Sequence, residues 1–280
     1  MHHFLVVLYG KSFDESSTLQ TLQNHLPSEL TARVLLWNNG PDSLRSALDS
    51  SNQIARLKQK GVKINFKESL ENRSLSEIYN EVWDGIDTSL TILDDDTYLT
   101  SAYFQGLKVF ATSDSLVLIP KIEVGEHLVY PKFKGIKNVE QLSNNDLIQQ
   151  PAVSVMSAVT VKPELKTLLN KKFPDLFDVR FCFYGIDSTF FKRLRMIGYK
   201  TFFLASPLNH SLSSEDEVLT DFRVRERLID SCLQIRNYPS LGAVKGLLLN
   251  LRAFGAKRVL KERNNLFYSL WHGVHPRIKQ

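Results

Sequence analysis

The stretch Leu90-Thr91-Ile92-Leu93-Asp94-Asp95-Asp96 places three consecutive carboxylates directly after a short apolar run. The run 90–93 has the length and composition of a buried strand, so the carboxylates stand at its carboxyl end. Adjacent anions repel one another unless a cation or hydrogen-bond donors lie among them, and this favours a divalent-metal site. Asp94 and Asp96 share one face if the strand continues. For an acidic triplet taken by itself, a solvated turn or a helix cap is the alternative.

Strand-like and helix-like segments alternate before this stretch. Apolar runs and helical spacing predict these elements in order: strand 4–9, helix 16–26, strand 33–37, helix 43–61, strand 62–66 and helix 74–86. Such alternation predicts an α/β fold in which helices cover a parallel sheet. Ligands of these sheets bind beyond the carboxyl ends of the strands, where Tyr9, Asn38 and the acidic triplet are expected to converge.

The composition fits one large globular domain. The chain has 280 residues, of which 43% are hydrophobic, and its apolar runs are far shorter than the roughly 18 residues that span a bilayer. Met1-His2-His3 leads into a strand rather than a basic signal sequence, so we expect a cytoplasmic protein. Cys182 and Cys232 have no CxxC spacing, and we expect buried thiols.

Two phosphate-binding motifs are excluded after the first strand. Tyr9-Gly10-Lys11-Ser12-Phe13 has one glycine, whereas a dinucleotide fold requires GxGxxG at this point. Gly10-Lys11-Ser12 is similar to the end of a phosphate loop, but the upstream glycine is missing. A bound diphosphate must therefore be neutralised in another way, which a metal on the acidic triplet supplies.

Three motifs of the first half together resemble family 2 glycosyltransferases, which are inverting, nucleotide-sugar-dependent enzymes with the GT-A fold. The family's Asp-Asn-Gly-Ser corresponds to Asn38-Asn39-Gly40-Pro41-Asp42, and its Asn-x-Gly-x-x-x-Ala-x-Asn is similar to residues 72–80. Its DXD element matches Asp94-Asp95-Asp96. The resemblance implies a Rossmann-like, mostly parallel mixed sheet flanked by helices.

The second half carries further parts of the same pattern. Residues 177–181, Phe-Asp-Val-Arg-Phe, resemble the family's Phe-Asp-x-x-Phe. Residues 185–199 align without a gap on Gly-Glu-Asp-x-Asp-Leu-x-x-Arg-Leu-x-x-x-Gly-Tyr. A strand over 200–204 and Asn209-His210-Ser211 follow in the family's order. The resemblance covers about residues 4 to 212 and implies a catalytic domain over 1–215.

The resemblance assigns roles to individual residues. Asp96 with Asp94 would hold Mg²⁺ or Mn²⁺, since hard cations prefer carboxylate oxygens. His210 is a further candidate metal ligand, although a structural histidine is the alternative. Asp187 would be the general base; because it precedes the helical pattern 190–197, a helix cap is its alternative. The expected donor-binding residues are Leu8, Tyr9, Asn38, Asn72, Asn80, Asp94 and Asp95.

Three positions depart from the family pattern. Asn38 replaces an aspartate, and its amide could pair with the imide edge of uracil or thymine or, alternatively, stabilise the turn at Asn39-Gly40. Ile186 replaces the glutamate before Asp187, and Ser74 replaces a glycine. These losses keep open a non-catalytic nucleotide-sugar-binding or scaffold protein with the same fold.

The tail over 216–280 is expected to be a helical, basic extension. Residues 221–280 hold 12 Lys+Arg and 4 Asp+Glu, a net charge of +8, whereas the whole chain has +5, which leaves −3 for residues 1–220. Apolar and basic residues interleave over two expected helices, 219–235 and 241–263, and residues 267–271 are aromatic-rich. Such a tail could lie on an anionic membrane, or its apolar faces could pack on the catalytic domain.

The resemblance to family 2 glycosyltransferases thus implies a hexosyltransferase. The expected reaction is metal-dependent inverting transfer from a UDP- or dTDP-linked sugar to a glycan acceptor carried on a polyprenyl diphosphate. Family members with such tails often transfer rhamnose, galactose or other hexoses in O-antigen or capsule synthesis. Nucleic acid is not an expected partner, because no recognised binding module accompanies the basic tail. Peripheral contact with the inner face of the cell membrane is expected through the tail.

Overall fold

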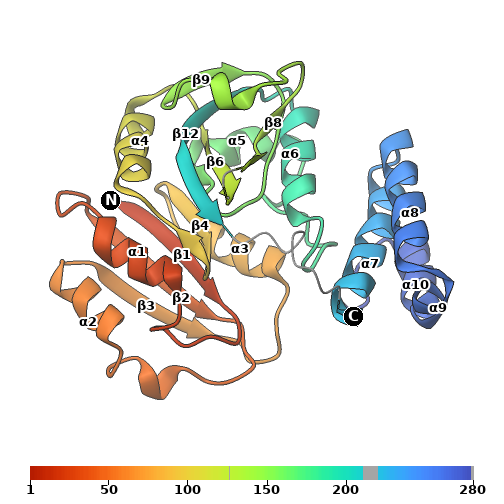
Figure 1. The fold of residues 1–280 in the computed structure, drawn as a ribbon, viewed down its shortest axis with the longest axis horizontal. Helices are drawn as coiled ribbons and strands as arrows, with labels where there is room; N and C mark the ends of the chain where they lie inside the picture. The colour runs from red at the N-terminus through yellow and green to blue at the C-terminus, as the bar shows by residue number, and fades with distance from the viewer. Residues whose placement is uncertain (126, 211–219, 279–280) are drawn as a thin grey trace.

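A curled mixed sheet forms the centre of the computed structural model, which describes residues 1–125, 127–210 and 220–278 (Figure 1). The strands on its main path are β1 (His2–Leu8), β2 (Ala32–Asn38), β3 (Lys63–Glu68), β4 (Leu90–Asp94), β5 (Thr97–Tyr98), β6 (Val117–Val124), β11 (Thr160–Val161) and β12 (Thr201–His210). They lie in the order β3-β2-β1-β4-β11-β6-β12-β5. β1 to β4 are parallel, β12 is parallel to β6, and β11 and β5 are antiparallel to their neighbours. The predicted α/β class with a mostly parallel sheet is confirmed.

Shorter strands extend the sheet at one side. β7 (His127–Tyr130) pairs with β6, and β9 (Asp146–Gln149) pairs with β12. β8 (Lys132–Phe133) and β10 (Ala152–Val153) form a separate two-stranded ribbon.

Both faces of the parallel strands are buried, because their apolar residues occupy successive positions. In β1, Phe4, Val6 and Leu8 contribute to one core cluster, and Leu5 and Val7 contribute to the other. The helices of the first two hundred residues are α1 (Ser17–His25), α2 (Asn52–Gln59), α3 (Leu75–Asp84), α4 (Ser101–Thr112), α5 (Glu164–Leu169) and α6 (Ile186–Met196). α1, α2 and α4 cover the Phe4 face, whereas α3, α5 and α6 cover the Leu5 face.

The prediction of a helix over 43–61 is wrong for the first half of that range. A 3-10 turn, η1 (Arg45–Ala47), precedes the shorter helix α2, which begins after the N-cap Ser51. The Ser51 hydroxyl accepts a hydrogen bond from the Ile54 amide at 3.4 Å and donates one to Asp14 at 2.7 Å. The N-cap therefore fixes the start of this helix, which apolar spacing alone does not specify.

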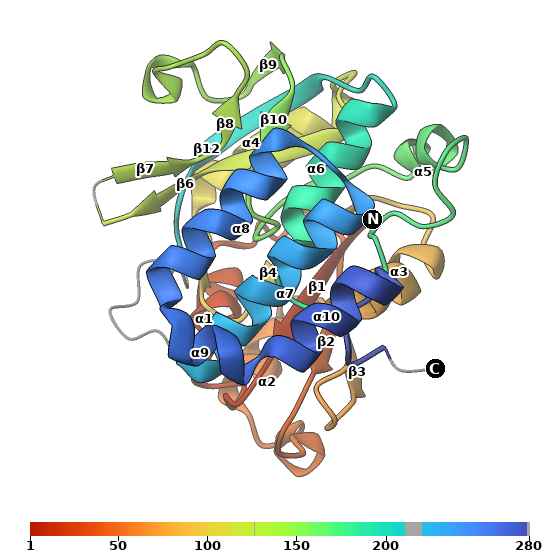
Figure 2. The ribbon, with the colours of Figure 1, turned by 90° about the vertical axis from the view of Figure 1, so that its right-hand side faces the viewer.

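The tail forms a layer of helices beside α6 (Figures 1 and 2). Its helices are α7 (Asp221–Asn237), α8 (Leu241–Phe254), α9 (Ala256–Lys261) and α10 (Arg263–His272). The single helix expected over 241–263 is divided at Gly255, whose φ of 76° and ψ of 154° end α8. The expected start of the first tail helix at 219, and the expected domain boundary between 215 and 216, lie outside the described residues.

α7 belongs to the packing of the larger core, since Ile229 and Leu233 are buried in the cluster that contains Leu5. The thiols of Cys182 and Cys232 are free and buried, as expected. None of the helices in the described ranges combines the length and apolar character that crossing a bilayer requires.

Candidate active site

The three side chains of the acidic triplet, at the end of β4, make contacts on two different sides. β4 ends at Asp94, beside Val7 of β1, and a turn leads through Asp96 to β5. β5 pairs antiparallel with the end of β12, where His210 lies opposite Thr97. This pairing brings a residue 114 positions away in the chain to the acidic turn. The strand expected over 200–204 is longer than predicted because β12 continues to His210; Ser211 lies outside the described residues.

His210 contacts two of the three carboxylates. Its Nδ1 lies 3.2 Å from Oδ1 of Asp96, and its Nε2 lies 3.7 Å from Oδ2 of Asp94. Burial lowers the pKa of His210, but the contact with Asp96 and the charges of Asp94 and Asp187 outweigh it and give a net rise. Burial among these groups raises the pKa of Asp94 to about 6, an effect that His210 opposes and Asp96 reinforces. The three side chains therefore form one electrostatically coupled group.

This group fits a divalent cation. One potential ligand atom from each of Asp94, Asp96 and His210 lies within 4.8 Å of the others. Oδ1 of Asp96 and Nδ1 of His210 are buried and have no well-aligned hydrogen-bond partner among the described residues, although they lie 3.2 Å apart. A buried polar atom without a partner raises the free energy of the folded state, and a cation bound to both atoms would satisfy them. Two carboxylate oxygens and one imidazole nitrogen suit Mn²⁺ and are compatible with Mg²⁺.

Asp95 faces the first loop instead. Its carboxylate accepts hydrogen bonds from Nζ of Lys11 at 2.6 Å and from the Tyr9 amide at 3.2 Å. Its backbone oxygen accepts from the Ser16 hydroxyl at 2.9 Å. Asp95 thus holds the β1–α1 loop against the acidic turn. Leu8, expected at the donor, is fully buried in the core, and its carbonyl accepts from the Asn39 amide at 2.8 Å.

Asn38 does not offer the free amide that pairing with a base requires. It is 1% exposed, and its Nδ2 donates to the Asp42 carbonyl at 2.7 Å and also interacts with Glu68. Its Oδ1 accepts from the Gly40 amide at 3.1 Å. Because these local contacts use both polar ends of the amide, Asn38 stabilises the turn, which is the alternative interpretation of the sequence.

Two further asparagines expected at the donor have backbone roles. Asn72 adopts a φ of 54°, and its Oδ1 accepts from Nδ2 of Asn39 at 3.3 Å. Asn80 is buried on α3, where its Nδ2 donates to the Phe177 carbonyl and its Oδ1 accepts from the Phe177 amide, both at 2.9 Å. Asn80 therefore joins α3 to the segment before α6 through both polar ends of its amide.

Asp187 lies in the first turn of α6. This helix begins at Ile186, four residues before the expected start, and its N-cap is Gly185 with a φ of 87°. The helix-cap alternative for Asp187 is therefore not observed. Burial raises the pKa of Asp187 to about 7; the neighbouring Asp94 adds to the rise, and a hydrogen bond with the Met156 backbone opposes it. A carboxylate that exchanges protons near neutral pH is suited to general-base chemistry.

Other residues of the site have no signal in the sequence motifs. Tyr79 of α3 is buried near both Asp94 and Asp187, whose negative charges add to the rise that burial produces in the pKa of its hydroxyl. The Ser157 hydroxyl hydrogen-bonds to Asp94. For Lys11, the sequence signal is the similarity of its stretch to the end of a phosphate loop. Asp230 of α7 also lies here, because a Cβ on Gly185 would fall 2.1 Å from its Oδ1.

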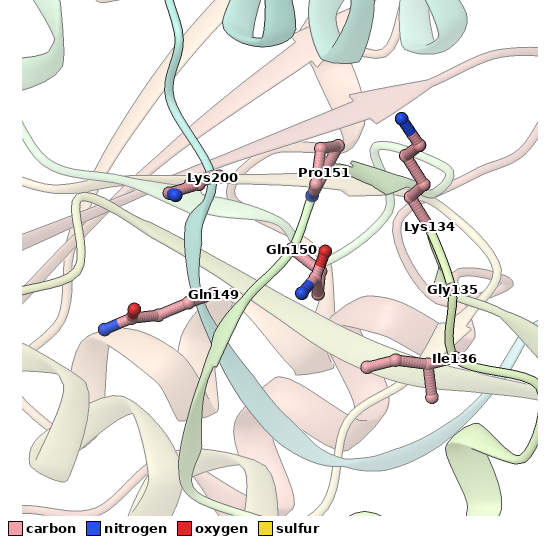
Figure 3. A pocket seen from close by; sticks show the side chains of 7 residues that line it. All are labelled: Lys134, Gly135, Ile136, Gln149, Gln150, Pro151 and Lys200. Carbon is pink, nitrogen blue, oxygen red and sulfur yellow. The ribbon is translucent and has the colours of Figure 1, made fainter.

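A separate hollow lies at the other end of β12. Figure 3 shows its lining, which comes from residues 134–136, 149–151 and Lys200. Lys200 directly precedes β12, whereas His210 ends it, so about 30 Å of strand separates the two positions. The hollow is therefore distinct from the carboxylate group.

Solved structures share this arrangement of the chain. No protein-family model matches the sequence, and no curated protein matches it. S. aureus TarS is similar over 99% of this chain and 49% of its own, with 11% identity and a TM-score of 0.54. GalNAc-T7, solved with UDP, GalNAc and Mn²⁺, is similar over 97% of this chain and 57% of its own, with 11% identity and a TM-score of 0.58.

The mannosyltransferase PcManGT from Pyrobaculum calidifontis, solved with GDP-Man and Mn²⁺, is similar over 97% of this chain and 72% of its own, with 13% identity and a TM-score of 0.54. The chain thus spans about half the length of the TarS and GalNAc-T7 chains. The fold is that of the GT-A glycosyltransferase structures. At these identities the likeness establishes the fold and leaves the activity to the site.

Proposed function

We propose that this protein is a metal-dependent glycosyltransferase that moves a hexose from a nucleoside diphosphate sugar to a hydroxyl of a glycan acceptor. The observation that carries the proposal is the close approach of Asp94, Asp96 and His210 at the carboxyl ends of the central strands, with Asp187 close enough to interact electrostatically with Asp94 and His210. In this fold class, ligands bind at that edge. Structures of the same fold that were solved with Mn²⁺ and either UDP and GalNAc or GDP-Man support the proposal.

Asp94, Asp96 and His210 are the proposed ligands of Mn²⁺ or Mg²⁺. A bound divalent cation supplies electrostatic stabilisation of the negative charge that grows on a leaving diphosphate. The Asp95 carboxylate would act indirectly, since it fixes the loop with Lys11 and Tyr9 beside the donor. Tyr9 and Asn72 remain proposed donor contacts through this loop and the turn at Asn39.

Asp187 is the proposed general base. It would accept the proton of the acceptor hydroxyl as that oxygen attacks the anomeric carbon opposite the departing diphosphate. Its position at the first turn of α6 stabilises the charged carboxylate, whereas burial and Asp94 oppose the charge. A single displacement of this kind inverts the anomeric centre and needs no covalent intermediate.

The donor class proposed is a nucleoside diphosphate hexose, with UDP- or dTDP-linked sugars as first candidates. Asn38 does not support the choice of uracil or thymine as the nucleobase, because its amide forms hydrogen bonds within the turn. The acceptor proposed is a glycan carried on a polyprenyl diphosphate, in synthesis of an O-antigen or capsule type, with rhamnosyl or galactosyl transfer among the candidates. Both assignments rest on the family resemblance of the sequence.

A donor panel tests the function. We expect Mn²⁺ together with one of the UDP-, dTDP- or GDP-linked sugars to raise the unfolding temperature, because a ligand that binds the native state stabilises it. Slow metal-dependent hydrolysis of the same donor, abolished by EDTA, is expected for an enzyme. Metal-dependent binding without any hydrolysis or transfer would favour the non-catalytic alternative. Absence of donor binding in the presence of either metal would contradict both.

A further inference from the structure

The helices α8, α9 and α10 form the outermost layer of the molecule. α7 separates them from the sheet, since Ile229 and Leu233 enter the large core while Val224 and Leu228 pack on Phe254 of α8. All three outer helices lie on the side that faces the viewer in Figure 2. Their outward surface is therefore the part of the tail that a partner would meet.

The outward surface of α8 carries several large apolar side chains. Leu241, Val244 and Leu248 follow one another at helical spacing and are all exposed, with Leu241 at 91% and Leu248 at 60%, and Leu249 extends the same surface. The opposite side of α8 packs on α7: Phe254 is buried, and Nδ2 of Asn250 donates to the Ser231 hydroxyl at 2.8 Å. A surface helix of a soluble domain normally turns polar residues outward, so this face is unusual.

α10 adds large aromatic side chains to the layer. Phe267 is 67% exposed and Trp271 is 68% exposed, and their rings stack with centroids 6.0 Å apart. Leu270, between them, is also exposed. Exposed Trp and Phe beside leucines are typical of segments that enter the headgroup region of a bilayer.

The exposed charges of the layer have one sign. Between residues 241 and 272 the acidic residue is Glu262, which is buried. The basic residues of this span are Lys245, Arg252, Lys257, Arg258, Lys261 and Arg263. Asp221 of α7 pairs with Lys261 at 2.7 Å and with Arg258 at 3.8 Å, which offsets part of the charge of α9. On α8, Lys245 and Arg252 are exposed and, by helical spacing, lie on the same face as Leu241, Leu248 and Leu249.

We propose that the outer face of α8 and α10 docks the protein on an anionic lipid bilayer, with Leu248, Leu249, Phe267 and Trp271 entering the interface and Lys245 and Arg252 meeting lipid phosphates. Anionic headgroups complement a face whose exposed charges are positive. A second copy does not fit as well, because symmetric pairing of two such faces would set like charges against each other. The inference goes beyond the proposed activity and does not depend on it.

α7 connects the outer layer to α6, the helix that carries Asp187. Nε2 of Gln234 on α7 donates to the Ser188 hydroxyl at 2.9 Å, one residue after Asp187 on α6. A bilayer bound to the outer layer would therefore lie on the side of the molecule where α6 is, with α7 and α8 between it and the helix that carries the proposed base (Figure 1). This placement suits an acceptor that is held in a membrane.

Vesicle cosedimentation of the full chain without donor tests the proposal. The vesicles contain phosphatidylcholine alone, or phosphatidylglycerol in place of half of it. We expect binding to the anionic vesicles that weakens with salt, and little binding to the neutral ones. The Lys245→Gln/Arg252→Gln variant should bind about thirtyfold more weakly, and Leu248→Ser/Trp271→Ser about a hundredfold more weakly.

The control is Lys108→Gln/Val109→Ser on α4, which removes one exposed basic and one exposed apolar group and so samples each kind of change away from the proposed face. α4 lies across the molecule from α8 (Figure 1), so this variant should bind as the wild type does. Equal vesicle binding by all variants would overturn the proposal. A concentration-dependent dimer that Leu248→Ser/Trp271→Ser abolishes, with no vesicle binding by the wild type, would assign the face to a second copy and would also overturn it.

Discussion

Replacing Asp187 by asparagine separates the proposed chemistry from the binding of donor and metal. The two side chains have nearly the same shape, and the amide oxygen can still accept the hydrogen bond from the Met156 backbone. The proposed metal ligands Asp94, Asp96 and His210 are untouched. Donor affinity should therefore stay near that of the wild type, whereas turnover should fall about a hundredfold to ten-thousandfold, the usual loss for a general base.

Because the pKa of Asp187 is raised, the variant and the wild type should differ in stability in a way that depends on pH. A carboxyl group whose folded pKa lies above its unfolded value destabilises the fold as it ionises, so the native state loses stability between about pH 4 and about pH 7 and stays lower above that. The shift from 3.8 to about 7 would correspond to about 4 kcal/mol at neutral pH. Because Asp94 is coupled to the same site, we expect about half of this, roughly 2 kcal/mol. Asp187→Asn should therefore be more stable than the metal-free wild type at about pH 8 and equally stable at about pH 3.

Calorimetric titration with donor and Mn²⁺, turnover against pH, and denaturant unfolding without metal measure these effects. Wild-type turnover should rise with pH up to about 7 or somewhat below it, since a bound cation favours the ionised carboxylate. The control is Asp175→Asn, whose carboxyl also has a pKa raised by burial but lies near Arg193, in the last turn of α6. Turnover within a few fold of the wild type in Asp187→Asn would refute the assignment of the base, whatever the stability result.

Asp96→Ala should abolish transfer and the Mn²⁺-dependent thermal shift by donor, because one carboxylate of the proposed metal group is lost; an unchanged shift would contradict its role as a ligand. Asn80→Ala should lower the free energy of unfolding by about 2 to 3 kcal/mol, measured by urea denaturation, since two buried backbone groups lose their partner, while the Kd for donor remains within a few fold. Gly185→Ala should destabilise by more than about 2 kcal/mol, because the new Cβ would lie 2.1 Å from an α7 carboxylate oxygen at a φ of 87°. Gly198 has a φ of 78°, and a Cβ there would meet no described atom within 4 Å, so Gly198→Ala should cost only about 1 kcal/mol. Equal losses in the two variants would count against the close contact at Gly185.

The periodicity of the N-terminal half determined the parallel part of the sheet. Its strands are continuous apolar runs because both faces are buried, and the helices between them show amphipathic spacing, so a local pattern reports a global arrangement. The same pattern located the acidic triplet at a strand end. Helix starts were less certain, as at Ser51, because a cap depends on a partner as distant as Asp14.

The motifs indicated which polar residues matter but not which of them would be satisfied locally. Asn38 and Asn80 stand at motif positions, yet the turn and the Phe177 backbone use their amides. A sequence gives the hydrogen-bonding capacity of an amide and not its neighbours. Those neighbours are set by close packing, which the motif does not encode.

Only the tertiary structure decided how the candidate site is assembled. The two-residue strand β5 is too short to be recognised from periodicity, but its pairing with β12 carries His210 to Asp94 and Asp96. The tail shows the same division. Its sequence established that it is basic and amphipathic, whereas the packing of α7 on the core decided that Leu241, Leu248 and Leu249 of α8 face outward. Periodicity fixes which residues share a face of a helix, and long-range contacts fix which face is covered.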